Sequence, residues 1–208
     1  MADPVALVDY GAGNLHSVHN ALRAVGADVR ITADPADIRR AARIVLPGVG
    51  AFAACREGLT AIGGMVEALE QRVLADGVPF LGICVGMQLL ADTGRERGDT
   101  PGLGWIAGTV EPIRPADPSI RVPHMGWNDV ALPRAAADHP VLEEGEAYFL
   151  HSYHFRAADG AHVAAMTDHG GGLVAAVARD NILGVQFHPE KSQAYGLALL
   201  HRFADWSP

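Results

Sequence analysis

A cysteine, a histidine and a glutamate occupy positions in this sequence that suit nucleophilic catalysis. Residues 82–86 read Gly-Ile-Cys-Val-Gly, so Cys84 has a glycine two residues away on each side. This is the nucleophile-elbow pattern, with cysteine in place of serine. A strand that turns sharply into a helix strains the corner residue, and its neighbours must lack side chains for the turn to close. Cys84 would then lie at the start of a helix, where a thiolate nucleophile is favoured.

A base, and a group to orient it, follow near the other end of the chain in His188-Pro189-Glu190. Pro189 favours an extended backbone at His188, and residues i and i+2 of an extended segment project to the same side. Glu190 can therefore accept a hydrogen bond from one imidazole nitrogen while the other faces Cys84. The pattern predicts a Cys84-His188-Glu190 triad. The structural alternatives are a small core cysteine and a strand-ending turn with a solvated glutamate.

The elements that must position this triad are two buried strands. Residues 78–83 form an apolar run without alternation, and the last strand is expected at residues 182–187. Such runs are typical of strands buried on both faces of a parallel sheet. Further strands are expected at residues 5–8, 29–32 and 44–46. Helices are expected from residue 15, at Pro35, within residues 51–75 and after Cys84 through Leu90, and the third of these is interrupted at Gly63-Gly64. The alternation of strands and helices along the chain predicts an α/β fold with a flavodoxin-like core, in which a doubly wound, mostly parallel sheet is flanked by helices.

The middle of the chain changes character. Residues 93–104 are polar and glycine-rich and are expected to form a surface loop that carries Glu96. Residues 105–133 contain frequent prolines and short alternating runs, which predict antiparallel hairpins added to the main sheet. Later strands are expected at 148–153, 162–166 and 174–178, and Ser192 is expected to cap a closing helix. No linker or repeat interrupts the pattern, so residues 1–208 are interpreted as a single domain.

Composition narrows the classes of function. The 208 residues are 49% hydrophobic and 19% charged, which suits a sizeable core. A net charge of −8 and the lack of a long basic run argue against binding to nucleic acid or to a membrane surface. Only two cysteines occur, Cys55 and Cys84, and no signal-like or membrane-length apolar segment is found. A cytoplasmic protein is therefore expected.

Neither a metal site nor a cofactor site is expected. The ten histidines include no H-E-x-x-H arrangement, and no C-x-x-C occurs. His151 and His154 are three residues apart on an expected strand and would point to opposite faces. The glycine turn at residues 11–14 lacks the third glycine of a dinucleotide-binding fingerprint, because His16 stands at that position.

Another glycine-rich turn follows the strand at 44–46. Residues 47–50 read Pro-Gly-Val-Gly and expose backbone N–H groups in the crevice where open α/β sheets bind ligands. On its own, this turn would be interpreted as an ordinary loop.

Five stretches of the chain carry a family resemblance. They are residues 9–14, 47–50, 82–88, 125–128, and 148–153 taken with 186–192. Together they resemble the triad (class I) glutamine amidotransferases, and more narrowly the glutaminase subunits of imidazole glycerol phosphate synthase in histidine biosynthesis. The elbow and the His-Pro-Glu segment are shared by the whole class, whereas Pro-Gly-Val-Gly is discriminating. Val85 departs from the pattern, since the family commonly has leucine there.

The resemblance implies an activity and a set of site residues. Cys84 would attack the carboxamide carbon of L-glutamine, with His188 as acid and then base, and water would hydrolyse the thioester to glutamate. The backbone amides of Val85 and of the Val49-Gly50 segment would hold the oxyanion. The positions that match the family's glutamine-binding residues are Gly48, Gly50, Gln88, Glu96, Ser152 and Tyr153.

The resemblance also implies a partner, because free ammonia escapes into water unless it is delivered directly. The partner in this family is a (β/α)8-barrel cyclase, with which the glutaminase forms a heterodimer. The matching interface positions are Asn14, Trp127, Tyr148 and Lys191. We hypothesise that Val49 presents the wrong backbone group to the oxyanion until the partner and its ligand bind. Two alternatives stay open: a glutaminase of another synthase, such as one for anthranilate or pyridoxal phosphate, and a non-enzymatic cysteine sensor on the same fold.

Overall fold

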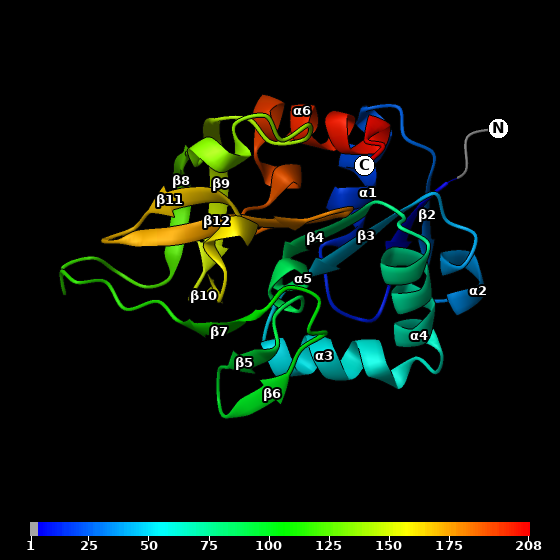
Figure 1. Cartoon of the computed structure of the whole chain (residues 1–208), viewed down its shortest axis with the longest axis horizontal. Helices are drawn as coiled ribbons and strands as arrows, with labels where there is room; N and C mark the ends of the chain where they lie inside the picture. The colour runs from blue at the N-terminus through cyan, green and yellow to red at the C-terminus, as the bar shows by residue number, and fades with distance from the viewer. Residues whose placement is uncertain (1–3) are drawn as a thin grey trace.

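The computed structural model describes residues 4–208 and is built around a seven-stranded sheet (Figure 1). In spatial order its strands are β11 (Val163–Asp168), β12 (Gly172–Arg179), β13 (Ile182–Val185), β4 (Phe80–Cys84), β3 (Arg43–Gly48), β1 (Val5–Val8) and β2 (Val29–Thr32). The strands from β13 to β2 pair in parallel, whereas β11 and β12 add an antiparallel hairpin at one edge. The predicted α/β class, with a mostly parallel sheet, is confirmed.

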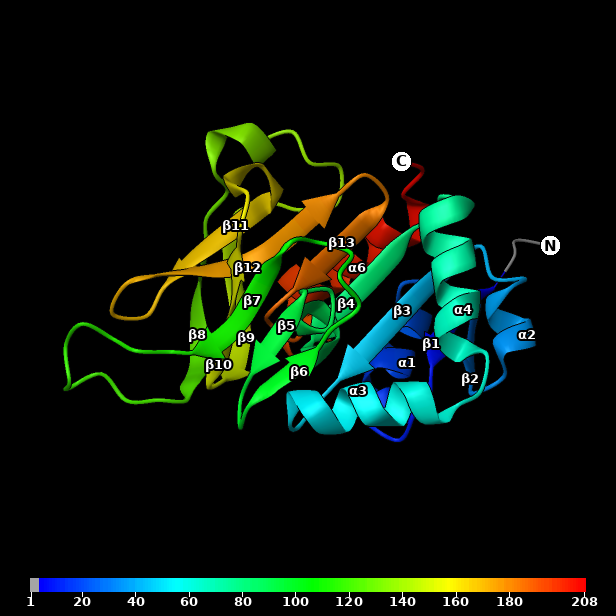
Figure 2. The same cartoon turned by 60° about the horizontal axis from the view of Figure 1, so that its bottom comes forward.

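Helices cover both faces of this sheet. α1 (Leu15–Ala24) and α6 (Gln193–Asp205) pack together on one face, while α3 (Phe52–Ala61) and α4 (Met65–Glu70) lie on the other (Figures 1 and 2). A π-helical turn, Gln71–Ala75, continues α4. The break between α3 and α4 falls at the predicted glycine pair, where Gly64 has a φ of +82° that suits glycine. Within the described residues, no helix combines the length and the apolar character needed to cross a membrane.

The strands that carry the site are fixed by burial. Every residue of β1, β4 and β13 is buried, as expected for strands covered on both faces. Their apolar side chains join one hydrophobic cluster with residues of α1, α3 and α6. Burying a side chain such as Leu or Phe contributes roughly 1.5–3 kcal/mol. The carboxyl ends of these strands are therefore held firmly relative to one another.

The middle of the chain departs from its predicted placement. Residues 93–104 are not a loop, because β5 (Thr93–Arg95) and β6 (Asp99–Pro101) form a hairpin that carries Glu96 between them. The antiparallel strands predicted within 105–133 exist, as β7 (Gly108–Pro112) and β8 (His124–Val130), but they do not join the main sheet. One side sheet has the order β10-β7-β5-β6, and another pairs β8 with β9 (Gly145–His151). Alternating residues identify strands, whereas the partner of each strand depends on tertiary contacts.

Three local expectations also need correction. The single strand expected at 148–153 is divided, since β9 ends at His151 and β10 (Tyr153–Ala157) begins two residues later. The helix after Cys84 ends at Gln88, because the Leu90 and Ala91 amides bond to carbonyls three residues back rather than four. Ser192 precedes α6 but does not cap it: its Oγ donates to the His188 carbonyl at 2.7 Å and accepts from the Tyr148 amide at 2.9 Å.

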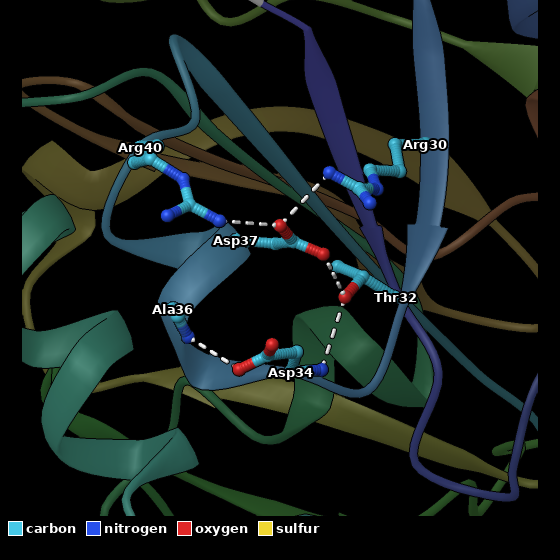
Figure 3. Close-up of polar contacts among 6 residues, drawn as sticks. All are labelled: Arg30, Thr32, Asp34, Ala36, Asp37 and Arg40. Carbon is cyan, nitrogen blue, oxygen red and sulfur yellow. Dashed lines mark hydrogen bonds and ion pairs between the residues drawn. The ribbon is translucent and has the colours of Figure 1, made fainter.

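A polar cluster after β2 joins that edge strand to the short helix α2 (Pro35–Ile38), as Figure 3 shows. Asp34 caps α2 by accepting from the Ala36 amide at 2.8 Å. Asp37 accepts from Thr32 at 2.8 Å and from the guanidinium groups of Arg30 and Arg40, each at 2.9 Å. We call these residues the β2–α2 cluster. It is built from adjacent segments of the chain and fixes the α2 turn that the sequence predicts at Pro35.

Candidate active site

Cys84 is the corner between β4 and the short helix α5 (Val85–Gln88). Its backbone is strained, with a φ of +55° and a ψ of −111°. A Cβ at Gly86 would lie 1.9 Å from the Leu46 carbonyl oxygen, and one at Gly82 would lie 2.6 Å from the Gly86 oxygen. Both glycines are therefore required for the elbow to close between β3 and β4, as the sequence pattern indicates.

His188 and Glu190 follow β13, the strand next to β4 in the sheet. His188 is extended, with a φ of −104° and a ψ of 97°, as the following proline favours. The chain then turns, because Pro189–Lys191 is a 3-10 turn and not the extended segment that we expected. This turn brings Glu190 Oε1 to 2.9 Å from His188 Nδ1. The contact expected between the two side chains is present, but it is produced by a turn.

The charge state of His188 is set by its neighbours. Burial acts to lower its pKa, but hydrogen bonding and charge interaction with Cys84 and Glu190 outweigh that effect and raise the pKa to about 10. His188 is therefore protonated at neutral pH when it faces a thiolate. Its side chain is 3% exposed and that of Glu190 is 1% exposed, so bulk water screens this interaction weakly.

Gln186 is a site residue that the sequence analysis did not single out. It is fully buried, and its Nε2 lies 3.7 Å from Cys84 Sγ. Its Oε1 accepts from Gln88 Nε2 at 2.9 Å. The sequence carries one signal for it, a polar residue in the otherwise apolar strand expected at 182–187. In the structure, β13 and β4 are parallel neighbours with Val185 opposite Ile83, and this pairing puts Gln186 opposite the nucleophile.

A cavity of about 180 Å³ opens beside Cys84. Nine residues predicted for catalysis, oxyanion stabilisation or glutamine binding line it: Val49, Gly50, Cys84, Val85, Gln88, Glu96, Ser152, Tyr153 and His188. Gly48 does not line it but pairs opposite Cys84 at the end of β3. A larger cleft of about 860 Å³, between β7, β10 and β12, contains neither Cys84 nor His188 in its lining. The chemistry therefore places the site at the smaller cavity.

Glu96 is held in the cavity wall by α3. Its Oε2 accepts from the Phe52 amide, the first of the helix, at 2.8 Å. Its backbone oxygen lies 3.3 Å from the Tyr153 hydroxyl. A carboxylate at a helix N-terminus interacts favourably with the free amides there. Glu96 is therefore an anchored charge at the cavity and not a freely solvated loop residue.

A chain of buried histidines supports the opposite wall. The Tyr153 carbonyl accepts from Gln88 Nε2 at 3.0 Å and lies 2.8 Å from His151 Nδ1. His151 Nε2 lies 2.9 Å from His124 Nδ1, and His124 Nε2 lies 3.0 Å from Asn128 Nδ2. Because a carbonyl only accepts, His151 donates from Nδ1, and each bond of the chain then runs in one direction from Asn128 to Tyr153.

Burial lowers the pKa of His151 to about 3 and that of His124 to about 4, so both rings are neutral. This neutral state is the one that the single-direction chain of bonds requires. This chain was not predicted from the sequence, because His151 and His154 were expected on one strand, whereas they belong to β9 and β10.

Comparison with known proteins decides the family. A family model described as glutamine amidotransferase class-I matches residues 6–205. The chain belongs to this family. As a class-I glutamine amidotransferase it is an enzyme, so the alternative of a non-enzymatic cysteine sensor is wrong. The roles of individual residues at the cavity stay predictions.

The relatives of this amidotransferase carry a more specific name. Imidazole glycerol phosphate synthase subunit HisH of Zymomonas mobilis subsp. mobilis is 61% identical over 98% of this chain and 96% of that protein. The protein of the same name from Rhodospirillum rubrum is 55% identical over 98% and 99% of the two chains.

Solved structures share the fold at low sequence identity. A glutamine amidotransferase has a TM-score of 0.74 at 19% identity, covering 97% of this chain and 99% of that one. PurLQS from Thermotoga maritima has a TM-score of 0.73 at 18% identity, covering 98% of each chain.

Beside the cavity of this amidotransferase lies an exposed aromatic surface. The Trp127 and Tyr148 rings meet edge to face with centroids 6.2 Å apart, and Lys191 Nζ lies 5.8 Å from the Tyr148 centroid. Trp127 is 46% exposed, and Met125 on the same strand is 65% exposed. Three of the four predicted interface residues are thus adjacent. The fourth, Asn14, directly precedes α1, which packs against the Pro189–Lys191 turn.

Proposed function

We propose that this enzyme is the glutaminase subunit of an imidazole glycerol phosphate synthase. It hydrolyses L-glutamine to glutamate and ammonia and passes the ammonia to a cyclase partner in histidine biosynthesis. The observation that carries the proposal is that Cys84 and His188 line one cavity, with Glu190 in contact with His188, in a chain 61% identical to a protein of that name. The name of that relative favours a synthase of histidine biosynthesis over a synthase for anthranilate or pyridoxal phosphate.

In the first half of the reaction, Cys84 Sγ bonds to the carboxamide carbon of glutamine. The carbonyl π bond opens and places negative charge on the oxygen. His188 donates its proton to the amide nitrogen, and the C–N bond then breaks to release ammonia and leave a thioester. Glu190, 2.9 Å from His188 Nδ1, holds the ring so that Nε2 faces the sulfur and the leaving group.

In the second half, water attacks the thioester while His188 takes its proton. The C–S bond breaks, and glutamate leaves with Cys84 restored. In both halves the oxyanion accepts from the Val85 amide at the elbow and from the Val49-Gly50 segment across the cavity. Loss of one such donor typically costs ~10²–10³ in rate, so both walls of the cavity are needed for full activity.

The same cavity is proposed to bind the rest of glutamine. Gln88 uses its amide nitrogen for Tyr153 and Gln186, which leaves its oxygen to accept from the substrate. Glu96 provides a carboxylate for the α-ammonium group. The backbone of Ser152 and Tyr153, with Gly48 and Gly50, would hold the α-carboxylate of glutamine and the methylene groups between its α-carbon and its carboxamide.

The proposed partner is a (β/α)8-barrel cyclase. Trp127 and Tyr148 present aromatic surface beside the cavity, and aromatic anchors of this kind are enriched at interfaces. Lys191 lines the cavity and also lies over Tyr148, so it joins the interface to the site. With Asn14 these residues form the proposed docking surface. Two free, buried cysteines suit a cytoplasmic location, which we include in the proposal.

The deciding experiment compares glutamine hydrolysis by the purified chain alone, with the cyclase, and with the cyclase and its nucleotide ligand. We expect the ternary mixture to be fastest. The Cys84→Ala variant in the same complex should lose glutamine-dependent synthesis and keep synthesis fed by high external ammonium. Loss of the ammonium-fed reaction as well would contradict the assignment of Cys84. Equal hydrolysis by the free chain and the complex would contradict the proposed switch at Val49.

A further inference from the structure

Two buried side chains hold carbonyl groups on either side of the Val49 amide. The Tyr10 hydroxyl donates to the Pro47 carbonyl oxygen at 2.6 Å. The Cys55 thiol donates to the Val49 carbonyl oxygen at 3.4 Å. Tyr10 is 5% exposed and Cys55 is fully buried in α3. Neither contact belongs to the triad, and both act on residues 47–50, the segment proposed to complete the oxyanion site.

Holding a carbonyl fixes the plane of its whole peptide, because the peptide bond is rigid. The two contacts therefore restrain the Pro47–Gly48 and the Val49–Gly50 peptides. Between them, the Gly48–Val49 peptide can rotate only about ψ of Gly48 and φ of Val49. A side chain at Gly48 would lie 2.7 Å from the Gly86 amide nitrogen and 2.8 Å from the Tyr10 hydroxyl, so glycine is required there.

Both donors keep their protons at neutral pH. Burial is the largest cause that raises the pKa of Cys55 and the pKa of Tyr10. A thiol has one proton to donate, and Cys55 directs it to Val49. In a trans peptide the C=O and N–H groups point in opposite directions, so the Gly50 amide points away from Cys55. Val49 and Gly50 both line the cavity that contains Cys84.

We propose that Cys55 is a positioning residue for the oxyanion segment. By holding the Val49 carbonyl, it fixes the Val49–Gly50 peptide and confines any rearrangement of the segment to the Gly48–Val49 peptide. The effect on catalysis rests on the proposed glutaminase function. The effect on the backbone does not, and it can be measured separately.

The test compares Cys55→Ala with Cys55→Ser in the complex with the cyclase. Both substitutions remove nearly the same volume, and only serine retains a donor. We expect Cys55→Ala to lower kcat for glutamine hydrolysis about three- to tenfold with KM within about twofold, the scale of one neutral hydrogen bond. Cys55→Ser should stay within about twofold of wild type. Equal kcat values for the two variants would overturn the proposal.

Two controls separate positioning from general loosening of the fold. Leu59→Ala removes a fully buried side chain one turn further along the same helix. It should lower the melting temperature and leave kcat at 25 °C within about twofold; a loss equal to that of Cys55→Ala would overturn the proposal. In both Cys55 variants Cys84 is the only thiol of this chain, so alkylation by iodoacetamide reports on Cys84 alone. Its alkylation rate should equal that of Cys84 in the wild type, because the nucleophile itself is unchanged.

Backbone motion at Gly50 gives a readout that does not depend on activity. We expect Cys55→Ala to lower the NMR order parameter of the Gly50 amide from the value of rigid backbone, roughly 0.85, toward the range below about 0.6 that is typical of flexible segments, and Cys55→Ser to leave it near the wild-type value. If the complex fails to hydrolyse glutamine, the proposed function fails, and this order parameter still decides the role of Cys55. An unchanged order parameter in Cys55→Ala would overturn that role.

Discussion

Two polar clusters in this molecule differ in how their parts are brought together. The β2–α2 cluster joins residues of one strand and the helical turn that follows it (Figure 3). The site joins Cys84 at the end of β4 to His188 and Glu190 after β13, roughly half the chain away. The side chains of Arg30 and Arg40 are 62% and 71% exposed, whereas that of Glu190 is 1% exposed.

The two clusters also differ in how fully their carboxylates are satisfied. In Asp37, one oxygen accepts from Arg30 and Arg40 and the other accepts from Thr32. In Glu190, Oε1 faces His188, while Oε2 is buried with no partner among residues 4–208. Both oxygens of Asp37 are thus occupied within the first cluster, which suits a structural role. The proposed role of Glu190 is to orient His188, and the one oxygen that contacts the imidazole is enough for that role.

The largest expected effect comes from Glu190→Gln, which keeps the shape and removes the charge. If the site is the catalytic cluster, the neutral amide no longer fixes the imidazole tautomer or stabilises the imidazolium. We expect kcat to fall by ~10²–10⁴. Steady-state kinetics in the complex measure this, with the melting temperature as a check on folding. A loss below about threefold would mean that Glu190 is as structural as Asp37.

The next effect concerns pH. In the proposed mechanism, activity requires His188 to be protonated, and its pKa is raised because hydrogen bonding and charge from Cys84 and Glu190 outweigh burial. Activity should therefore persist as pH rises above the ordinary histidine range and fall as pH passes through about 10. Glu190→Gln removes one of the causes that raise this pKa, so the alkaline fall should move to lower pH. Profiles of kcat/KM from pH 6 to pH 11 decide this, and an unmoved alkaline limb would contradict the interaction.

A smaller effect is expected in the histidine chain, which is buried like the site and well paired like the β2–α2 cluster. His124 stacks on Phe149 at 4.6 Å, so His124→Phe keeps an aromatic ring and removes both hydrogen bonds. We expect the free energy of unfolding in urea to fall by about 1–3 kcal/mol, because His151 loses its donor. The KM for glutamine should rise about threefold with little change in kcat, through Tyr153. An unchanged KM would show that the chain is structural only.

The sequence predicts those parts of the fold and site that local chemistry determines. The elbow follows from two glycines around Cys84, and the His188–Glu190 contact follows from spacing, although by a turn rather than an extended segment. The buried strands follow from apolar runs that suit no other environment.

The missed parts depend on which strands become neighbours. Gln186 reaches Cys84 only because β13 pairs with β4, and the histidine chain requires β8 to pair with β9. The sequence of the hairpin that carries Glu96 predicts a polar loop, because β5 and β6 are each only three residues long. No periodicity can develop over such short strands, so their pairing has no local signal.

The smallest effect is expected from Asp37→Asn, the counterpart of Glu190→Gln in the β2–α2 cluster. Hydrogen bonds from Thr32 and Arg40, with the charge of both arginines, lower the pKa of Asp37 in the folded state. A lowered pKa stabilises the fold above the ordinary aspartate range, and this stabilisation is lost as pH falls through the folded-state pKa. Asp37→Asn should therefore lower the melting temperature slightly at pH 7, and the difference from wild type should shrink toward pH 3. Glutamine hydrolysis at pH 7 should be unchanged, because both oxygens of Asp37 are already used within the cluster. Loss of activity without loss of stability would mean that this cluster, too, serves the reaction.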